Sequence, residues 1–225
     1  MTLDTETARR NMVRQQIRCW DVSSPRILAV LENVPREHFV PAQYANLAFA
    51  DTMLPLETNA TGDEQKMLKP NLEGRILQEL DIQATDKALV VGTGSGYLTA
   101  CLARLAKHVT SIDTAAERTE KARQRLDDLG IVNVDLHVQD EFDQPVTTRF
   151  DVIAVTGSLP VYDACIEAWL NPGGRAFVVV GTAPAMEACL IERSNADEIS
   201  YRSLFETVIP PLANAPLSAC VKFLL

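Results

Sequence analysis

From residue 71 onward, short apolar runs alternate with segments in which apolar residues recur every three or four positions. The short runs predict buried strands, and the longer periodicity predicts helices that pack on those strands. In order, the predicted elements are a helix carrying Leu72, Ile76, Leu77 and Leu80, strand 87–91, helix 97–105, strand 108–112, helix 115–129, strands 134–138 and 150–155, helix 162–170 and strand 175–180. This alternation predicts an α/β fold with a doubly wound, mostly parallel, Rossmann-like sheet.

The last part of the chain contains three more apolar runs without helical segments between them. These runs span residues 188–193, 199–209 and 218–225. Strands that follow one another without a crossover helix pair in antiparallel fashion. We therefore expect them to complete the sheet with an antiparallel edge.

The first 70 residues have a different pattern. A helical face carries Met12, Val13, Gln16, Ile17 and Trp20, and a second helix begins near Ser24 and ends before Pro35. From there to Pro70 the chain is rich in proline and polar residues, and we expect an irregular loop, a kind of segment that often carries function. The predicted organisation is an N-terminal helical addition with a substrate-side loop over residues 1–70, packed on a main domain over residues 71–225.

Composition limits the classes of partner. The chain of 225 residues has a formal net charge of −9, which disfavours nucleic acid because neutralising phosphates requires a basic surface. No apolar stretch reaches the ~20 residues of a membrane span, so no membrane partner and a cytoplasmic location are expected. The five cysteines form no C-x-x-C pair, and the three histidines lack ligand spacing, so no metal is expected.

Three alternate glycines, Gly92, Gly94 and Gly96, directly follow the strand at 87–91 and enclose Thr93 and Ser95. Glycine allows a tight turn and lets a ligand approach the backbone closely. In an open α/β sheet such a turn lies at the carboxyl ends of the strands, where ligands bind. Its N–H groups are expected to be free to meet an anion.

Acidic residues follow the next two strands. Asp113 lies about twenty residues beyond the first glycine, where a carboxylate accepts hydrogen bonds from both hydroxyls of a ribose. Asp140 follows the strand at 134–138 and is placed to accept from an adenine amine. A dinucleotide fingerprint would require glycine where Tyr97 stands. The pattern therefore favours S-adenosylmethionine, with Gly92, Thr93, Gly94, Ser95 and Gly96 as candidate cofactor contacts. The alternative is that the glycines merely shape a turn and the acids are solvated.

Several segments, taken in order, resemble the protein-L-isoaspartate O-methyltransferase family. They are VPREHFVP, YANLAFADTMLPL, VVGTGSGYLTACLARL, FDVIAVTGSLP, LNPGGRAFVVVG and TVIPPL. The resemblance implies a class I S-adenosylmethionine-dependent methyltransferase fold and methylation of a carboxylate in protein repair. It also implies that Gly92, Gly94, Asp113 and Asp140 contact the cofactor.

The resemblance breaks at GDEQKMLKP, where the family has a Thr-Ile-Ser-Gln-Pro-like segment whose serine lies at the substrate carboxylate. With Gln65 and Pro70 in register, Leu68 takes the place of that serine, and Lys66 and Lys69 replace its neighbours. Thr156, also a candidate cofactor contact, and Ser158 are candidate replacement hydroxyls, although local turn bonding explains them equally well. Exposed loop lysines are most simply solvated.

Three functions remain open from the sequence. The first is a methyltransferase acting on a peptide or small-molecule carboxylate. The second is a cofactor-binding sensor or scaffold that has lost catalysis, and the third is a nicotinamide-dependent dehydrogenase. The charge-rich segment ERTEKARQRLDDL is interpreted as a solvated helix face with no part in any of them.

Overall fold

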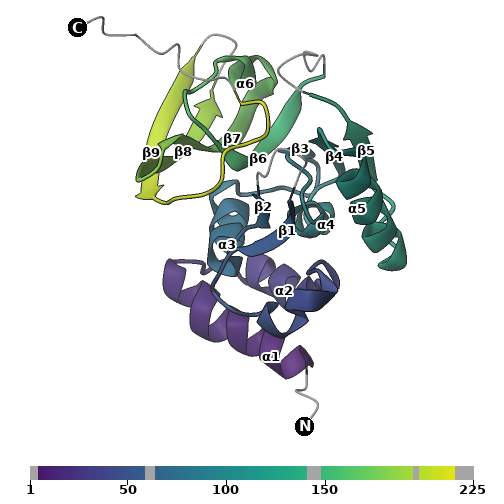
Figure 1. The fold of residues 1–225 in the computed structure, drawn as a ribbon. Helices are drawn as coiled ribbons and strands as arrows, with labels where there is room; N and C mark the ends of the chain where they lie inside the picture. The colour runs from purple at the N-terminus through teal and green to yellow at the C-terminus, as the bar shows by residue number, and fades with distance from the viewer. Residues whose placement is uncertain (1–4, 59–63, 141–147, 195–197, 216–225) are drawn as a thin grey trace, which may run out of the picture.

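The computed structural model describes residues 5–58, 64–140, 148–194 and 198–215. Its centre is a seven-stranded sheet in the order β5-β4-β3-β6-β7-β8-β9 (Figure 1). The strands are β3 (Lys87–Val91), β4 (His108–Asp113), β5 (Val134–Val138), β6 (Phe150–Leu159), β7 (Leu170–Thr182), β8 (Ala185–Arg193) and β9 (Ile199–Glu206). Strands β3 to β7 pair in parallel, and β8 and β9 add antiparallel neighbours. The predicted doubly wound sheet with an antiparallel edge is confirmed; the run at 218–225 lies outside the described residues.

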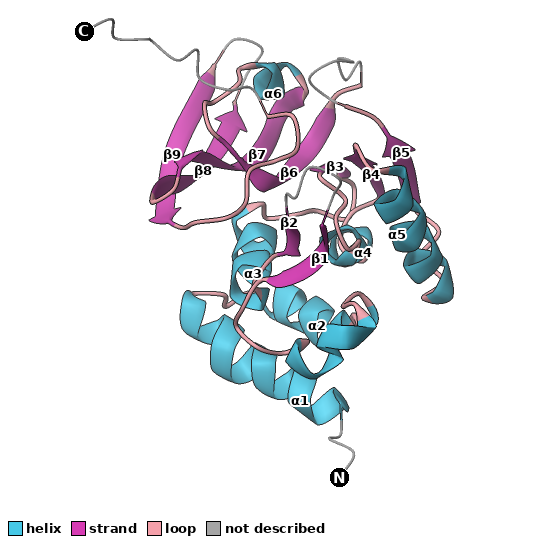
Figure 2. Cartoon of the chain, viewed as in Figure 1, coloured by secondary structure: helices cyan, strands magenta, loops and turns pink. Residues whose placement is uncertain are grey.

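From Pro70 onward the helices are α3 (Pro70–Glu79), α4 (Tyr97–Ala103), α5 (Ala116–Asp128) and α6 (Cys165–Ala168). Figure 2 shows α5 beside the parallel half of the sheet. The helix predicted over 162–170 is much shorter than expected. Leu170 instead pairs with Phe150 at the start of β7. Because the segment is buried, its backbone N–H and C=O groups need hydrogen-bond partners, and the neighbouring strand supplies them.

The N-terminal segment holds α1 (Thr5–Met12), a π-helical turn (Val13–Ile17), a 3₁₀ turn (Arg18–Trp20) and α2 (Pro25–Asn33). Two 3₁₀ turns follow, Arg36–His38 and Ala42–Leu47. The segment up to Pro70 is not irregular throughout, because β1 (Leu54–Thr58) and β2 (Glu64–Met67) form an antiparallel hairpin. Its buried pair, Leu54 opposite Met67, anchors the hairpin to the core. The local pattern of apolar residues does not predict this pairing.

One hydrophobic cluster joins the N-terminal helices to the sheet. It includes Ile17 and Leu31 from the N-terminal layer and Leu77 from α3. Gly74 of α3 makes this approach close, because a Cβ there would stand 2.7 Å from a methyl carbon of Ile17. No helix among the described residues is long and apolar enough to cross a membrane.

Candidate functional site

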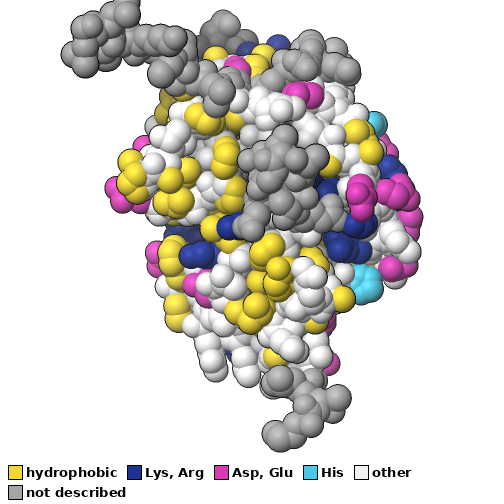
Figure 3. Space-filling view, viewed as in Figure 1, with side chains coloured by type: hydrophobic (Ala, Val, Ile, Leu, Met, Phe, Trp, Pro, Cys, Tyr) yellow, Lys and Arg dark blue, Asp and Glu magenta, His cyan; other side chains and the backbone are white. Residues whose placement is uncertain are grey.

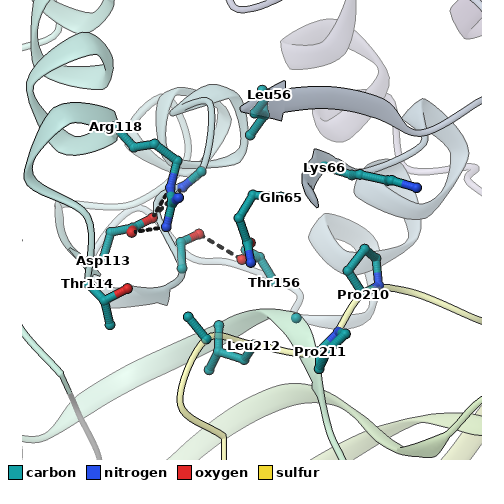
Figure 4. A pocket seen from close by; sticks show the side chains of 14 residues that line it. Leu56, Gln65, Lys66, Asp113, Thr114, Arg118, Thr156, Pro210, Pro211 and Leu212 are labelled. Carbon is teal, nitrogen blue, oxygen red and sulfur yellow. Dashed lines mark hydrogen bonds and ion pairs between the residues drawn. The ribbon is translucent and has the colours of Figure 1, made fainter. Parts of the chain in front are cut away.

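The pocket beside the glycine turn, named the main pocket, lies where the winding direction of the sheet reverses. β3 stands between β4 and β6, and ligands of open α/β sheets bind at the carboxyl ends of strands at such a point. Figure 4 shows side chains from several separate segments converging on this pocket. The lining residues are Leu56, Gln65, Lys66, Gly92, Gly94, Asp113, Thr114, Arg118, Thr156, Gly157, Pro210, Pro211, Leu212 and Ala213.

The glycine turn after β3 requires glycine at each alternate position. Gly92, Gly94 and Gly96 have φ values of +90°, +53° and +87°, which side chains with a Cβ rarely adopt. A Cβ on Gly92 would also stand 2.3 Å from Oγ1 of Thr156, and one on Gly96 would stand 3.0 Å from Cβ of Ala122 on α5. The turn is therefore shaped by its neighbours as well as by its own conformation.

The N–H groups of this turn are largely committed within the protein, unlike the sequence expectation. Gly92 and Thr93 both donate to the carbonyl of Ile112, at 2.9 and 3.1 Å, and Gly96 donates to Thr93 at 2.9 Å. The hydroxyl of Thr93 is buried against that of Ser111 at 2.7 Å. These bonds hold the turn in one conformation against β4.

Asp113 ends β4 with its carboxylate beside the turn. Its side chain is buried, with 4% exposed. Oδ2 accepts from the N–H of Gly94 at 3.0 Å, and Oδ1 accepts from that of Ala115 at 2.9 Å. Arg118 donates to the same two oxygens, through Nη2 to Oδ1 at 2.7 Å and through Nε to Oδ2 at 3.4 Å. The prediction that the charge-rich segment of α5 is a solvated face is wrong for Arg118, because this residue is buried and paired with Asp113.

A C-terminal strap, defined as residues 210–214, runs beside the end of β6 and lines the pocket. The N–H of Leu212 donates to the carbonyl of Ser158 at 2.9 Å, and the N–H of Ser158 donates to Pro210 at 2.9 Å. Gly157 permits this approach, because a Cβ there would stand 2.6 Å from the backbone of Leu212. Asn214 then donates to Oδ2 of Asp140 at 2.7 Å, so Asp140 contacts the strap and is outside the set that lines the main pocket.

The candidate replacement hydroxyls are engaged in local bonds. Thr156 donates to the carbonyl of Gly92 at 2.7 Å and lies 3.1 Å from that of Val91, while Ser158 donates to Ile209 at 3.4 Å. A hydroxyl has one proton to donate. In this conformation neither side chain has a proton for a substrate carboxylate, which favours the local-bonding interpretation.

The altered segment lies against the pocket from the N-terminal side. Gln65 and Lys66 line the main pocket, and Leu68 lines a smaller adjoining cavity beside Glu73 and the glycine turn. The Leu68 side chain is buried in the main hydrophobic cluster. The apolar residue at the expected serine position is therefore part of the core.

A buried ion pair below this segment was missed by the sequence reasoning. Arg36, from the VPREHFVP segment, pairs with Glu73 and donates to the carbonyls of Ala48 and Leu68 at 2.9 and 2.7 Å. Its guanidinium also lies 5.0 Å from the ring centre of Tyr97. Burial raises the pKa of Glu73 from 4.5 to about 7, and Arg36 opposes this rise. The pair fixes the backbone that leads from β2 into α3.

No group of three or more His, Cys, Asp and Glu side chains is placed to hold a metal ion within the described ranges. The polar side chains that line the pocket include the carboxylate of Asp113, the guanidinium of Arg118, the amide of Gln65 and the ammonium group of Lys66. This set suits an organic ligand with hydroxyl groups and charged ends.

The family model for protein-L-isoaspartate(D-aspartate) O-methyltransferase matches residues 7–215. A protein-L-isoaspartate O-methyltransferase of Rhodopseudomonas palustris is 32% identical over 206 residues, which cover 91% of this chain and 92% of the relative. One from Trichlorobacter lovleyi is 36% identical over 78% of this chain and 79% of its own. A crystal structure of a putative family member from Plasmodium falciparum, in complex with S-adenosyl-L-homocysteine, is similar in fold, with a TM-score of 0.77 at 16% identity over 91% of this chain and 97% of that one.

Proposed function

Because this chain belongs to the protein-L-isoaspartate(D-aspartate) O-methyltransferase family, we infer that it methylates the carboxylate of isoaspartyl residues in proteins, using S-adenosylmethionine. The observation that carries this inference is the buried carboxylate of Asp113 beside a glycine turn at the sheet's switch point. A small-molecule carboxylate would satisfy the same chemistry, and polypeptide is preferred because it is the substrate named for the relatives.

The residues of the pocket fit the cofactor. We propose that Asp113 holds the ribose once a ligand hydroxyl replaces one of its present donors. We also propose that Gly92, Gly94 and Ser95 border the amino-acid end, and that Asp140, which bonds to Asn214 beside the pocket, faces the adenine. Thr93, Gly96 and Thr156 serve by shaping the turn, as their bonds and close contacts indicate. When bound, the cofactor supplies a methyl group activated by a positively charged sulfur.

The protein's own task is then orientation. An isoaspartyl carboxylate is ionised at neutral pH, so no protein base has to remove a proton. Holding it in line with the methyl group and excluding water supply the catalysis. We propose that residues 1–70 form the substrate side of the site, because Leu56, Gln65 and Lys66 line the pocket opposite the strap. We also propose a cytoplasmic location.

The test is transfer of radiolabelled methyl from S-adenosylmethionine to a peptide containing one isoaspartyl residue. We expect base-labile label on this peptide and none on the matched peptide with ordinary aspartate. In parallel, the protein is titrated calorimetrically with S-adenosylmethionine and with NAD. We expect saturable heat with S-adenosylmethionine and none with NAD. Cofactor binding without methyl transfer would instead favour the sensor or scaffold, the alternative that the apolar Leu68 motivates.

Replacing Leu68 with serine, which restores the family's residue type, should lower stability and give little gain in methyl transfer. The side chain is buried in the core, and removing most of a buried leucine typically costs ~2–5 kcal/mol. Urea denaturation and the methyl-transfer assay provide the two measurements. Leu68→Met is the matched control, because a volume-conserving change typically costs less than ~1.5 kcal/mol. A serine variant as stable as the parent and markedly faster would contradict this prediction.

A further inference from the structure

The carboxylate of Asp113 has no hydrogen-bonding position left for a ligand. A carboxylate offers about four lone-pair positions, two on each oxygen. The N–H groups of Ala115 and Gly94 take one position on each oxygen, and Arg118 takes the second on each. A ribose that bonds through two hydroxyls therefore has to displace an existing donor.

Of these donors, Arg118 is the one that can move without displacing the backbone. The two N–H groups belong to the backbone of the glycine turn and of the residue before α5, and the turn is held by its bonds to Ile112. Arg118 reaches the carboxylate through a long, rotatable side chain, and of its two contacts the one at 2.7 Å is short and the one at 3.4 Å is weak. Figure 4 shows its guanidinium reaching over Asp113 from α5.

A second hollow, beside the main pocket, has space for the Arg118 side chain once it has left Asp113. It is lined by Pro41, Leu56, Gly94, Arg118, Lys121 and Arg125. Lys121 pairs with the exposed Glu117 at 2.9 Å, and Arg125 donates to the carbonyl of Ser95 at 3.1 Å. In Figure 3, dark blue side chains lie among magenta ones on the α5 side of the molecule. Three cations on one hollow are notable in a chain whose formal net charge is −9.

We propose that Arg118 competes with the cofactor's ribose for Asp113 and, once displaced, joins Lys121 and Arg125 in a subsite that binds acidic side chains of the polypeptide substrate. This inference rests on the proposed function for the identity of the two ligands. Its consequence is coupling, since the cofactor frees the cation that an acidic substrate needs. By linkage, an acidic peptide then raises cofactor affinity by the same factor.

The first test is the affinity for S-adenosylhomocysteine, measured by calorimetry without any methyl transfer. Arg118→Met removes the competitor, so the affinity should rise by about three- to tenfold, the net effect of no longer breaking one typical hydrogen bond. Arg118→Lys, which loses the planar fork, should also bind more tightly. Arg123→Met is the matched control on α5, because Arg123 pairs with exposed Glu120 and lies outside the hollow, and its affinity should not change. Weaker binding by Arg118→Met would show that Arg118 supports the cofactor site and would overturn the proposal.

The second test measures binding of two isoaspartyl peptides, one flanked by Asp and Glu and one by Asn and Gln. With S-adenosylhomocysteine present, the parent protein should bind the acidic peptide at least about fivefold more tightly than without it, beyond any gain for the neutral peptide. Arg118→Met should lose this excess. Arg118→Lys should keep a preference for the acidic peptide because the charge remains, but its excess should be smaller than the parent's because lysine competes less with the ribose. If the parent and Arg118→Met show the same cofactor-dependent gain in affinity for the acidic peptide over the neutral one, the proposed subsite is wrong. Since binding is the readout, an absence of methylation would count against the proposed function alone.

Discussion

Replacing Asp113 with alanine is expected to lower the affinity for S-adenosylmethionine by about one to two orders of magnitude. The reason is that hydrogen bonds to a charged group are typically worth ~1.5–3 kcal/mol. The structure strengthens this expectation, because Asp113 also orients the N–H of Gly94 and thereby holds the glycine turn. Calorimetric titration measures the change, and S-adenosylhomocysteine, which carries the same ribose, should lose affinity to the same extent.

Two further variants make the Asp113 result specific. Asp113→Asn keeps the shape and one carbonyl oxygen, so its affinity should fall between those of the parent and the alanine variant. Asp135→Ala removes an exposed acid of β5 that pairs with His108, and it should leave the affinity unchanged. If Asp113→Ala binds as tightly as the parent, the ribose does not lie on Asp113 and the site assignment fails.

Replacing Arg36 with methionine is expected to destabilise the protein by about 3–5 kcal/mol, because it leaves Glu73 buried without its counter-charge. In a chain of this size such a loss lowers the melting temperature by ~6–20 °C. The carbonyls of Ala48 and Leu68 would also lose a donor. Thermal and urea denaturation give the change in the free energy of unfolding.

The loss in the free energy of unfolding caused by Arg36→Met should become larger as the pH rises. Burial raises the pKa of Glu73 from 4.5 to about 7, so the folded state holds this proton more tightly than the unfolded chain. Stability from this group is therefore complete below pH 4.5 and is lost as the pH rises through 7. Without Arg36 the ionised form has no partner, so the difference between parent and variant should be larger at about pH 8 than at about pH 6.

The double variant Arg36→Met, Glu73→Leu serves as the control for the ion pair. Removing both charges abolishes the cost of an unpaired buried carboxylate, and such replacements are often close to neutral. It should recover much of the lost stability and show less pH dependence. A double variant as unstable as Arg36→Met would mean that the hydrogen bonds to Ala48 and Leu68, rather than the pair with Glu73, carry the stabilisation.

The sequence correctly predicted the parallel core of the sheet and its antiparallel edge. Strand 87–91 and strand 134–138 have the predicted bounds, because a buried strand between two turns is recognised from its own residues. The predicted secondary structure was wrong where pairing between strands determines the local structure. The hairpin at 54–67 and the long strand β7 depend on partners elsewhere in the chain, and short apolar runs do not reveal those partners.

By itself, then, the sequence determined the order of the elements, the turn at Gly92–Gly96 and the presence of an acid at the end of the next strand. These features depend on local periodicity, on glycine's conformational freedom and on short spacings along the chain. The tertiary structure alone decided which groups face the pocket. It brought Arg118 onto Asp113 and the strap onto Ser158, placed Leu68 in the core and engaged the Thr156 hydroxyl. Each of these outcomes depends on side-chain direction and on packing between separate elements, and neither is encoded in any single stretch of residues.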